Sequence, residues 1–324
     1  MMWQQQQHQQ QQMSMQQPLQ QYQPPQMMGM PPGAPGGMPP VKPPGPMGGG
    51  FPPQAPMGGP APGAFPSMAD LASNAGAGHT HQTVQDNEVK VMDPQGRLVQ
   101  GYARFATFEQ APFPQSIKAE LQRAGFPAPS QIQQYTWPLA AQMRDTIGVA
   151  ATGSGKTLAF LLPGMAHVAA QVGTEPRMLV LAPTRELVMQ IATEAEQFAL
   201  GFRLRLGLAF GGQDGEGDQM MQSRVLRRGV DVLVGTPGRL TKFAEASVVY
   251  LREVSYLVID EADQMLTDGF EPQIQEVLAL THPNRQVSLF SATWPPAVEA
   301  FAASVVDQPV RIVVDRADVL TANQ

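Results

Sequence analysis

The 324-residue sequence contains no cysteine, so disulfide bonds, thiolate catalysis and cysteine-ligated zinc are all excluded. Histidine is scarce as well. The five histidines show no spacing typical of metal ligands: His8, His79, His81, His167 and His282. A function built on cysteine chemistry or on a histidine-bound transition metal is therefore not expected.

Charge is nearly absent from the first 85 residues, which contain one basic residue, Lys42, and one acidic residue, Asp70. Residues 1–23 are mostly glutamine, and residues 24–66 are largely proline, glycine and methionine with few β-branched residues. Such a composition cannot bury enough apolar surface to offset the entropy lost on ordering. We therefore predict a disordered low-complexity tail over residues 1–85.

A leader and a membrane span are not expected either. The start, MMWQQQQH, has neither a basic segment nor an apolar core, which argues against a secretory signal. The longest apolar run, LAFLLPGMAHVAAQV, is interrupted by Pro163 and Gly164 and is too short to cross a bilayer. These features predict a soluble intracellular chain with no membrane partner.

A broad basic surface is missing too. Beyond the tail there are 20 basic and 26 acidic residues, so this part carries the whole formal charge of −6. The balance argues against nucleic-acid binding through a large basic face. It leaves room for a narrow site made of a few arginines and backbone amides.

The sequence after the tail does contain a regular alternation of short apolar runs and longer amphipathic stretches. We predict strands at residues 146–150, 177–182, 204–210, 230–235, 256–260, 286–290 and 310–314, and helices between them, for example at 184–200 and 218–229. Strands that are apolar on both faces and separated by helices indicate an α/β fold with a parallel sheet covered on both sides. We expect one such domain over residues 86–320, with its ligands at the carboxyl ends of the strands.

The stretch VAATGSGKT at 149–157 has the composition of a phosphate-binding loop between a strand and a helix predicted from Leu158. Glycines let successive backbone amides face phosphate oxygens, and the helix N-terminus adds a positive dipole. Lys156 is expected to bridge the β- and γ-phosphates, and the Thr157 hydroxyl to coordinate Mg²⁺. Ala150 stands where the general pattern has glycine, so a chance glycine-rich turn is the alternative. The predicted nucleotide contacts are Ala151, Thr152, Gly153, Ser154, Gly155, Lys156 and Thr157.

A second motif, YLVIDEAD, ends another buried strand at the same predicted sheet edge. Asp260 is expected to hold Mg²⁺, and Glu261 to orient and deprotonate an attacking water, which makes Lys156, Asp260 and Glu261 the catalytic set. Acidic residues after a strand also commonly cap the N-terminus of the next helix. In this alternative, Asp263 is the N-cap residue. Together the two motifs predict hydrolysis of ATP with Mg²⁺.

VAATGSGKT, VIDEAD, APTREL (182–187), GG (211–212), TPGR (236–239) and SAT (291–293) occur in the order and spacing of a DEAD-box RNA helicase. From about residue 105 to 315 the sequence resembles the first RecA-like domain of that family, in which the loop commonly begins with alanine. GFPAPSQIQ (125–133) resembles the family's Q motif, with Ser130 where threonine is usual. By this resemblance Gln133 reads the adenine edge and Phe108 stacks on the base. Ordinary packing beneath a loop is the alternative for Phe108.

The resemblance also implies RNA contacts from three loops, formed by Pro183, Thr184 and Arg185, by Gly211 and Gly212, and by Thr236, Pro237, Gly238 and Arg239. Helix N-termini and glycine amides bind phosphate without reading bases, so RNA binding is expected to be independent of sequence. Plain turn chemistry would favour the same residue types. After Gly212 the segment QDGEGDQ is a few residues longer than the family pattern.

Ser291 and Thr293 are short hydroxyl side chains suited to hydrogen-bonding Asp263. By the same resemblance this bond would couple the nucleotide site to RNA binding. A purely structural bond between the loop and its neighbouring strand is the alternative.

DEAD-box helicases have two RecA-like domains, of which the second supplies arginine fingers and half of the RNA groove. After Thr293 only 31 residues remain, and none resembles the family's HRxGRxxR motif. We therefore expect an ATP-dependent RNA helicase domain that is inactive alone and is completed by a second RecA-like domain in cis or in trans. The alternative is a non-catalytic nucleotide- or RNA-binding module whose tail self-associates. The Trp-Pro pairs at 137–138 and 294–295 resemble the branch that acts on nuclear RNA, which implies the nucleus, with the cytoplasm as the alternative.

Overall fold

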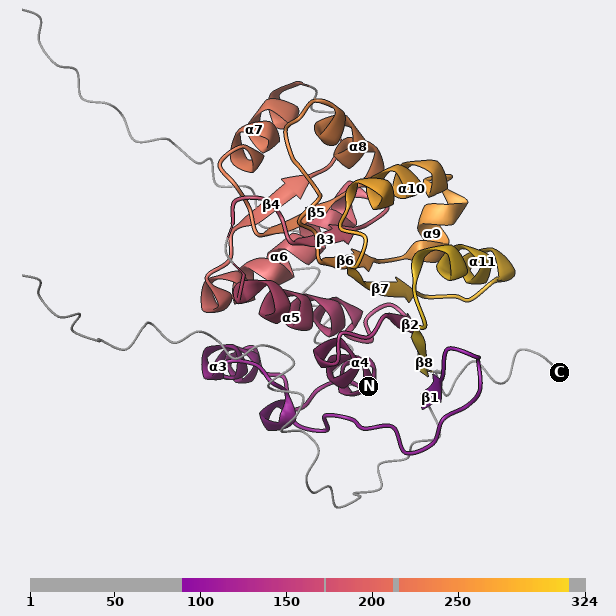
Figure 1. The fold of residues 1–324 in the computed structure, drawn as a ribbon. Coiled ribbons are helices and arrows are strands. Elements are labelled where there is room, and N and C mark those ends of the chain that lie inside the picture. The colour runs from indigo at the N-terminus through magenta and orange to yellow at the C-terminus, as the bar shows by residue number, and fades with distance from the viewer. Residues whose placement is uncertain (1–88, 172, 212–215, 315–324) are drawn as a thin grey trace, which may run out of the picture. The chain divides into compact units, whose positions relative to one another are not determined.

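The computed structural model describes residues 89–171, 173–211 and 216–314 (Figure 1). Their strands form one eight-stranded sheet in the order β1-β8-β2-β7-β6-β3-β5-β4. The strands are β1 (Val89–Met92), β2 (Thr146–Ala150), β3 (Met178–Leu181), β4 (Leu206–Ala209), β5 (Val232–Gly235), β6 (Tyr256–Ile259), β7 (Gln286–Ser291) and β8 (Val310–Val314). The tail predicted over residues 1–85 lies outside the described residues, so its disorder stays a prediction.

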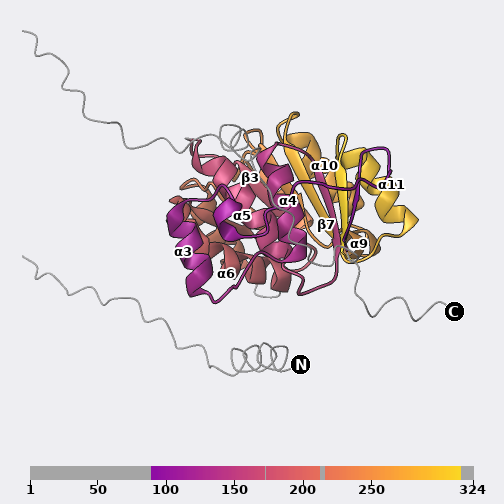
Figure 2. The same ribbon diagram turned by 90° about the horizontal axis from the view of Figure 1, so that it is seen from below.

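The helices that accompany the sheet are one 3-10 turn, η3 (Phe108–Gln110), and the α-helices α3 (Gln115–Arg123), α4 (Gln131–Ala141), α5 (Lys156–Ala169), α6 (Arg185–Phe202), α7 (Glu216–Leu226), α8 (Pro237–Glu245), α9 (Ala262–Thr267), α10 (Glu271–Leu280) and α11 (Pro296–Val305). Helices α4, α5 and α6 cover one face of the sheet, and α8, α10 and α11 cover the other (Figures 1 and 2). The predicted α/β sheet with helices on both faces is confirmed.

Burial on both faces follows from the strand sequences. In β3 the side chains of Met178 and Val180 join the core beneath α5 and α6, whereas Leu179 and Leu181 join the core on the opposite face. Successive residues of a strand point to opposite faces, so a strand covered on both sides is apolar at every position. This is why the seven predicted strands are found to within two residues of their expected bounds.

One strand was not predicted. β1 pairs antiparallel with β8, with Val89 opposite Val314, and closes one edge of an otherwise parallel sheet. Its sequence, VKVM, is short and exposes Lys90. A charged residue on an edge strand is a common feature that discourages pairing with another chain.

One prediction about α5, the residue at which it begins, was wrong. The helix begins at Lys156, two residues before Leu158, and it continues through Pro163 and Gly164 without interruption. Gly164 permits this because an added Cβ would lie 2.6 Å from the Met178 side chain and 2.8 Å from that of Tyr256. The glycine lets a buried helix approach the sheet closely, and this packing outweighs the cost of an internal proline. None of the helices in the described ranges combines the length and apolarity that a bilayer crossing requires.

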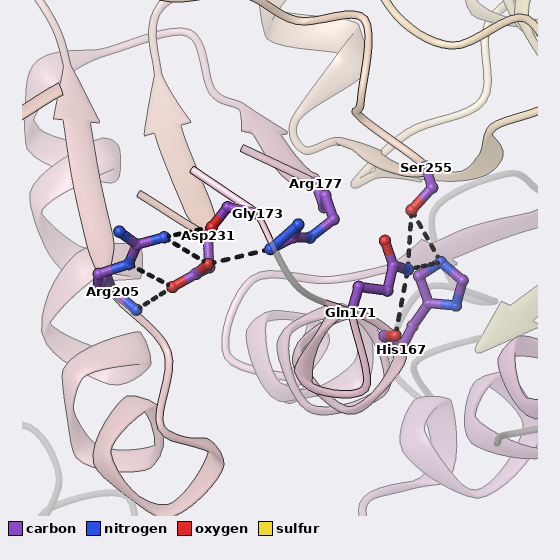
Figure 3. A network of polar contacts seen from close by, with 7 residues as sticks. All are labelled: His167, Gln171, Gly173, Arg177, Arg205, Asp231 and Ser255. Atoms are coloured by element: carbon purple, nitrogen blue, oxygen red, sulfur yellow. Dashed lines mark hydrogen bonds and ion pairs between the residues drawn. The ribbon is translucent and has the colours of Figure 1, made fainter. Parts of the chain in front are cut away.

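A polar network ties together the loops at the amino ends of the strands, opposite the motifs (Figure 3). Asp231, just before β5, accepts hydrogen bonds from the Arg205 side chain at 2.9 Å and from Arg177 at 3.3 Å. Arg205 also donates to the Gly173 carbonyl at 2.9 Å. Beside this group, His167 lies 3.0 Å from the Ser255 hydroxyl. These contacts hold together the amino ends of the strands, at the edge of the sheet opposite the motifs.

The carboxyl edge of the sheet divides into two halves. β2, β7 and β6 are consecutive neighbours and end at the phosphate loop, the SAT motif and the acidic motif. β3, β5 and β4 are consecutive neighbours and end at the APTREL, TPGR and GG loops. The strand order therefore groups the motifs predicted to bind nucleotide on one half of the edge and those predicted to bind RNA on the other.

Candidate functional site

The phosphate loop between β2 and α5 depends on two left-handed glycines. Gly153 and Gly155 have φ values of 75° and 91°, a region that favours glycine. An added Cβ on Gly155 would lie 2.7 Å from both the Gln133 amide nitrogen and the Ser130 hydroxyl, whereas one on Gly153 would meet nothing within 4 Å. Gly155 is thus closed in by α4, and the backbone at Gly153 is open to a ligand.

Gln133 ties this loop to α4. Its side-chain oxygen accepts from the Ser130 backbone N–H at 3.0 Å, and its side-chain nitrogen donates to the Gly155 carbonyl at 3.0 Å. An amide side chain keeps one further N–H and one further lone pair after these two bonds. The structure places Gln133 against the phosphate loop with capacity left for a base, and adenine reading stays a prediction.

Phe108 lies in the core. It is 7% exposed, and its ring centroid is 6.1 Å from that of Trp137, whose indole donates to the Leu158 carbonyl of α5 at 3.2 Å. These contacts are the ones expected if Phe108 only packs beneath a loop. Stacking of Phe108 on a base stays a prediction.

The loop presents two groups that fit a phosphate. The ammonium group of Lys156 is buried and donates to the Ala150 carbonyl at 2.8 Å, which holds it beneath the loop. The Ser154 hydroxyl oxygen is enclosed and has no hydrogen-bond partner among the described residues. Because an enclosed hydroxyl without a partner is costly, this one indicates a ligand that supplies acceptor oxygens. Ala151, half-buried, and Thr152, exposed, lie in the same loop between β2 and α5.

The acidic motif places a buried carboxylate beside this loop. Asp260 is 3% exposed, and one of its oxygens accepts from the Glu261 backbone N–H at 3.0 Å. Burial raises the pKa of Asp260 to about 6; the charge of Lys156 opposes the rise, and that of Glu261 adds to it. A carboxylate held in this way is stabilised by any further cation that binds next to it.

Glu261 has an unusual backbone. With φ 54° and ψ 50° it adopts the left-handed conformation and is the N-cap residue of α9, so the suggestion that Asp263 serves as the N-cap is wrong. A non-glycine residue in this region costs about 1 kcal/mol or more and persists only where the surrounding structure holds it.

Glu194 of α6 belongs to the same site and was missed in the sequence. Burial raises its pKa to about 7; a hydrogen bond from the Thr157 hydroxyl opposes the rise, and the charge of Asp260 adds to it. A signal for it exists, because Glu194 interrupts the buried apolar stripe of Ile191, Ala195 and Phe198 on α6. An acid on the inner face of a helix indicates a partner in the interior.

The residues present fit Mg²⁺. The Thr157 hydroxyl and the carboxylates of Asp260 and Glu194 are the hard oxygen ligands that this ion takes. No cluster of three or more acidic or histidine side chains able to hold a metal occurs in the described ranges. Mg²⁺ is commonly held by one or two protein oxygens, with water and substrate phosphates completing the shell.

The SAT motif is bonded to the acidic motif. The backbone N–H and the hydroxyl of Thr293 donate to one oxygen of Asp263 at 2.9 and 2.7 Å. Burial raises the pKa of Asp263, but the hydrogen bonds from Thr293 outweigh this and leave the pKa lowered. The Ser291 hydroxyl is enclosed and has no hydrogen-bond partner among the described residues, so the bond expected from Ser291 is not formed. The predicted bond between Asp263 and Thr293 is therefore present, and its role in coupling stays a prediction.

On the other half of the edge, two of the RNA loops lead into helix N-termini. Thr184 is the N-cap residue of α6 and accepts from the Leu187 backbone N–H at 3.2 Å, after the buried Pro183. Thr236 is the N-cap residue of α8, with Pro237 at the first position of the helix. An added Cβ on Gly238 would meet nothing within 4 Å, so the backbone of this loop is open.

Each of the two helix starts carries an arginine that lies over an aromatic ring. The guanidinium of Arg185 is 5.0 Å from the centre of the Phe210 ring, and that of Arg239 is 5.4 Å from the centre of the Phe243 ring. The Arg239 guanidinium approaches Gly211 of the third loop, and one of its nitrogens is buried without a hydrogen-bond partner among the described residues. Gly212 lies outside the described residues.

Gln222 of α7 holds the third loop and was also missed. Its side-chain oxygen accepts from the Phe210 backbone N–H at 3.1 Å, and its side-chain nitrogen donates to the Phe210 carbonyl at 3.2 Å. A single amide thus satisfies both backbone groups of the residue that precedes Gly211. No local pattern in the sequence signals this contact, because it joins a helix to the end of a strand twelve residues away.

A parallel sheet with a glycine-rich phosphate loop after β2 and a buried acidic motif after β6 defines the chain as a nucleotide-binding α/β protein of the RecA type. The family model for DEAD/DEAH box helicases matches residues 130–301, which is more than half of the chain. The chain belongs to the DEAD/DEAH box helicase family.

Similar proteins agree with this assignment. The chain is 45% identical over 225 residues to DEAD-box ATP-dependent RNA helicase 40 of Oryza sativa subsp. japonica, covering 68% of the chain and 28% of that protein. It is 43% identical over 221 residues to ATP-dependent RNA helicase dbp2 of Schizosaccharomyces pombe, covering 67% of the chain and 40% of that protein. The chain thus spans well under half the length of these relatives.

Solved structures are similar as well. The RNA helicase Prp28 of Chaetomium thermophilum bound to ADP matches with a TM-score of 0.64 and 31% identity, over 77% of this chain and 57% of that one. The yeast DEAD-box splicing factor Prp28 matches with a TM-score of 0.57 and 34% identity, over 62% and 50% of the two chains. The resemblance read from the motifs is confirmed at the level of the family.

Proposed function

We propose that this chain is the ATP- and RNA-binding domain of an ATP-dependent RNA helicase, in which hydrolysis of ATP with Mg²⁺ is coupled to RNA binding and duplex unwinding. The observation that carries the proposal is the division of the sheet edge. Nucleotide motifs end β2, β7 and β6, and RNA motifs end the adjoining strands β3, β5 and β4. Two ligands bound to adjacent strand ends of one sheet can influence each other through the strands between them.

At the nucleotide half, Lys156 would exchange the Ala150 carbonyl for the β- and γ-phosphates, while Ser154 and the loop amides bind the remaining oxygens. Thr157 and Asp260 would hold Mg²⁺, directly or through water, and the ion supplies charge stabilisation to the transferring phosphoryl group. Glu261 would orient the attacking water and accept its proton.

At the RNA half, the N-termini of α6 and α8 and the two arginines would bind the phosphate backbone. The predicted contacts are Pro183, Thr184, Arg185, Gly211, Gly212, Thr236, Pro237, Gly238 and Arg239. These groups offer backbone N–H donors and guanidinium groups, which recognise phosphate irrespective of the base. Binding would therefore be independent of RNA sequence, which suits an acidic domain with a narrow site.

Coupling between the halves would pass through Asp263 and Thr293. Their two hydrogen bonds join α9, which follows Glu261, to the segment after β7. A movement of β7 relative to β6 would lengthen these bonds and shift Glu261, which caps the same helix.

A second RecA-like domain, in cis or in trans, would complete the site by supplying the arginine fingers that the family resemblance implies. Such arginines raise the rate of phosphoryl transfer by about 10³–10⁵-fold. The Gln-, Pro- and Gly-rich tail would be disordered and would self-associate, and the protein would act in the nucleus. The intact set of Lys156, Asp260 and Glu261, with Glu261 held in a strained conformation, favours this catalytic function over that of a binding module without activity.

RNA-stimulated ATP turnover with Glu261→Gln as the variant tests the proposal. Glutamine keeps the size of the side chain but cannot accept the proton, so we expect any RNA-dependent turnover of the chain to fall to the no-enzyme background. Addition of a second RecA-like domain from a relative, supplied in trans, should raise the wild-type rate and leave the variant at background. Equal rates for the two proteins under both conditions would refute a catalytic role for Glu261.

A further inference from the structure

Arg185, which the proposed function places on the RNA backbone, has an acidic neighbour from another element. Its terminal nitrogen Nη1 lies 3.4 Å from Oδ2 of Asp218, in the first turn of α7. The two side chains are 34% and 42% exposed, so the pair is accessible to a ligand. This contact brings a carboxylate to a place where the site is expected to receive a phosphate.

The position of Asp218 is fixed by the helix that carries it. Four residues further along α7, Gln222 bonds both backbone groups of Phe210. Residues four apart lie on the same face of a helix, so the face that Gln222 anchors to the end of β4 is also the face that carries Asp218. The anchored helix therefore holds the carboxylate on the side of the RNA half.

The guanidinium of Arg185 also contacts an aromatic ring. It lies over the ring of Phe210, 5.0 Å from its centre, and this cation–π contact limits how far it can turn from Asp218. Arg239 provides a contrast, because it lies over Phe243 in a similar way but forms no ion pair with any of the described residues. Of the two arginines expected to bind phosphate, one has a carboxylate competitor.

We propose that Asp218 is a specificity-determining residue of the RNA site, whose carboxylate competes with an RNA phosphate for the guanidinium of Arg185. The inference rests on the proposed RNA function. A phosphate next to Arg185 stands close to Asp218, and two anions at such a distance repel each other. A backbone that also contacts Arg239 and the two helix N-termini overcomes this repulsion, whereas an isolated anion does not. Asp218 thus favours an extended RNA strand over small anions, at a cost in affinity.

The test is Asp218→Asn, measured by fluorescence anisotropy with fluorescein-labelled oligo(U). Asparagine keeps the shape and removes the charge. Exposed ion pairs are worth up to about 1 kcal/mol, so the variant should bind up to about fivefold more tightly than wild type. Glu196→Gln is the matched control, because it removes one exposed negative charge from the helix that carries Arg185, and it should leave the Kd unchanged.

Two further measurements separate competition from a general effect of charge. The advantage of Asp218→Asn should shrink as NaCl rises from about 50 mM to about 200 mM, because salt screens exposed charges. It should vanish in the Arg185→Ala background, because the guanidinium over which the two anions compete is then gone.

The outcomes distinguish this inference from the function on which it rests. If Asp218→Asn binds oligo(U) no more tightly than wild type, while Arg185→Ala still weakens binding, the competition is overturned and the RNA site stays in place. An equal gain in affinity in Asp218→Asn and Glu196→Gln also overturns the competition, because the change in net charge alone then explains the gain. If neither wild type nor Asp218→Asn binds oligo(U), the RNA function itself fails, and the competition fails with it.

Discussion

At the scale of single residues, Asp260 shows how this site trades stability for function. A carboxyl whose folded pKa is raised favours the protonated form in the native state, so folding is penalised at a pH where the group must ionise. A rise from 3.8 to about 6 corresponds to about 3 kcal/mol of penalty at neutral pH. The penalty is present above the folded pKa and disappears as the pH falls toward the unfolded value.

We therefore expect Asp260→Asn to stabilise the ligand-free protein at pH 7 by about 1–3 kcal/mol, since asparagine keeps the acceptor for the Glu261 N–H and carries no charge. Denaturant titrations at pH 7 and pH 5 would measure this, with a smaller difference at pH 5, where Asp260 is largely protonated. The same variant should lose the Mg²⁺ dependence of ATP binding. A variant less stable than wild type at both pH values would show that the native carboxylate is not penalised.

The residues found from the sequence and those missed differ in kind. Lys156, Asp260 and Glu261 stand in contiguous motifs, whose chemistry can be read wherever the chain places them. Gln222 and Glu194 act through contacts between elements that are remote in sequence, and only the fold reveals their partners. Of these two residues, only Glu194 has a signal in the sequence, because it is an acidic residue on an otherwise apolar face of a helix.

At the scale of elements, the network at the base of the sheet holds β3, β4 and β5 in register (Figure 3). Asp231 is 7% exposed and Arg177 is 5% exposed, so their pair is buried. Burial raises the pKa of Asp231, but hydrogen bonds from Arg205 and the charges of Arg205 and Arg177 outweigh it and leave the pKa lowered. Such a group contributes stability above its unfolded pKa and loses it as the pH falls through the folded value.

Asp231→Asn should therefore lower the free energy of unfolding by about 3 kcal/mol at pH 7, because it leaves the Arg177 guanidinium buried without its counterion. Urea denaturation at pH 7 measures the loss, with the exposed Asp268→Asn as a control expected to change little. The gap from wild type should narrow as the pH falls below about 4, because the unfolded state then binds a proton that the folded state, with its lowered pKa, binds only at a lower pH. A gap that stays constant across this range would mean that the carboxylate charge is not what holds the network.

The same scale explains which elements were predictable. Seven strands are largely apolar and therefore visible in the sequence, whereas β1 pairs with β8, which lies more than two hundred residues away in the sequence. The start of α5 and its passage through Pro163 also depend on packing, because the helix is buried against β3 and β6.

At the scale of the whole molecule, the strand order is what makes one domain suit two ligands. β7 lies between β2 and β6, so the SAT segment stands inside the nucleotide half, and β6 adjoins β3, where the RNA half begins. The chain spans 28% and 40% of the two relatives compared above. We propose that helicase activity requires a second RecA-like domain beside this one.

The most direct test of the central claim is equilibrium binding of mant-ATP with Mg²⁺ to the 324-residue chain, compared with Lys156→Ala and Thr157→Ala. We expect wild type to bind mant-ATP saturably, and the affinity to fall at least about tenfold in Lys156→Ala, which removes the cation for the phosphates. In Thr157→Ala, binding should lose its response to Mg²⁺. Wild-type binding that is absent, or equal binding by all three folded proteins, would contradict the assignment of this loop as the nucleotide site.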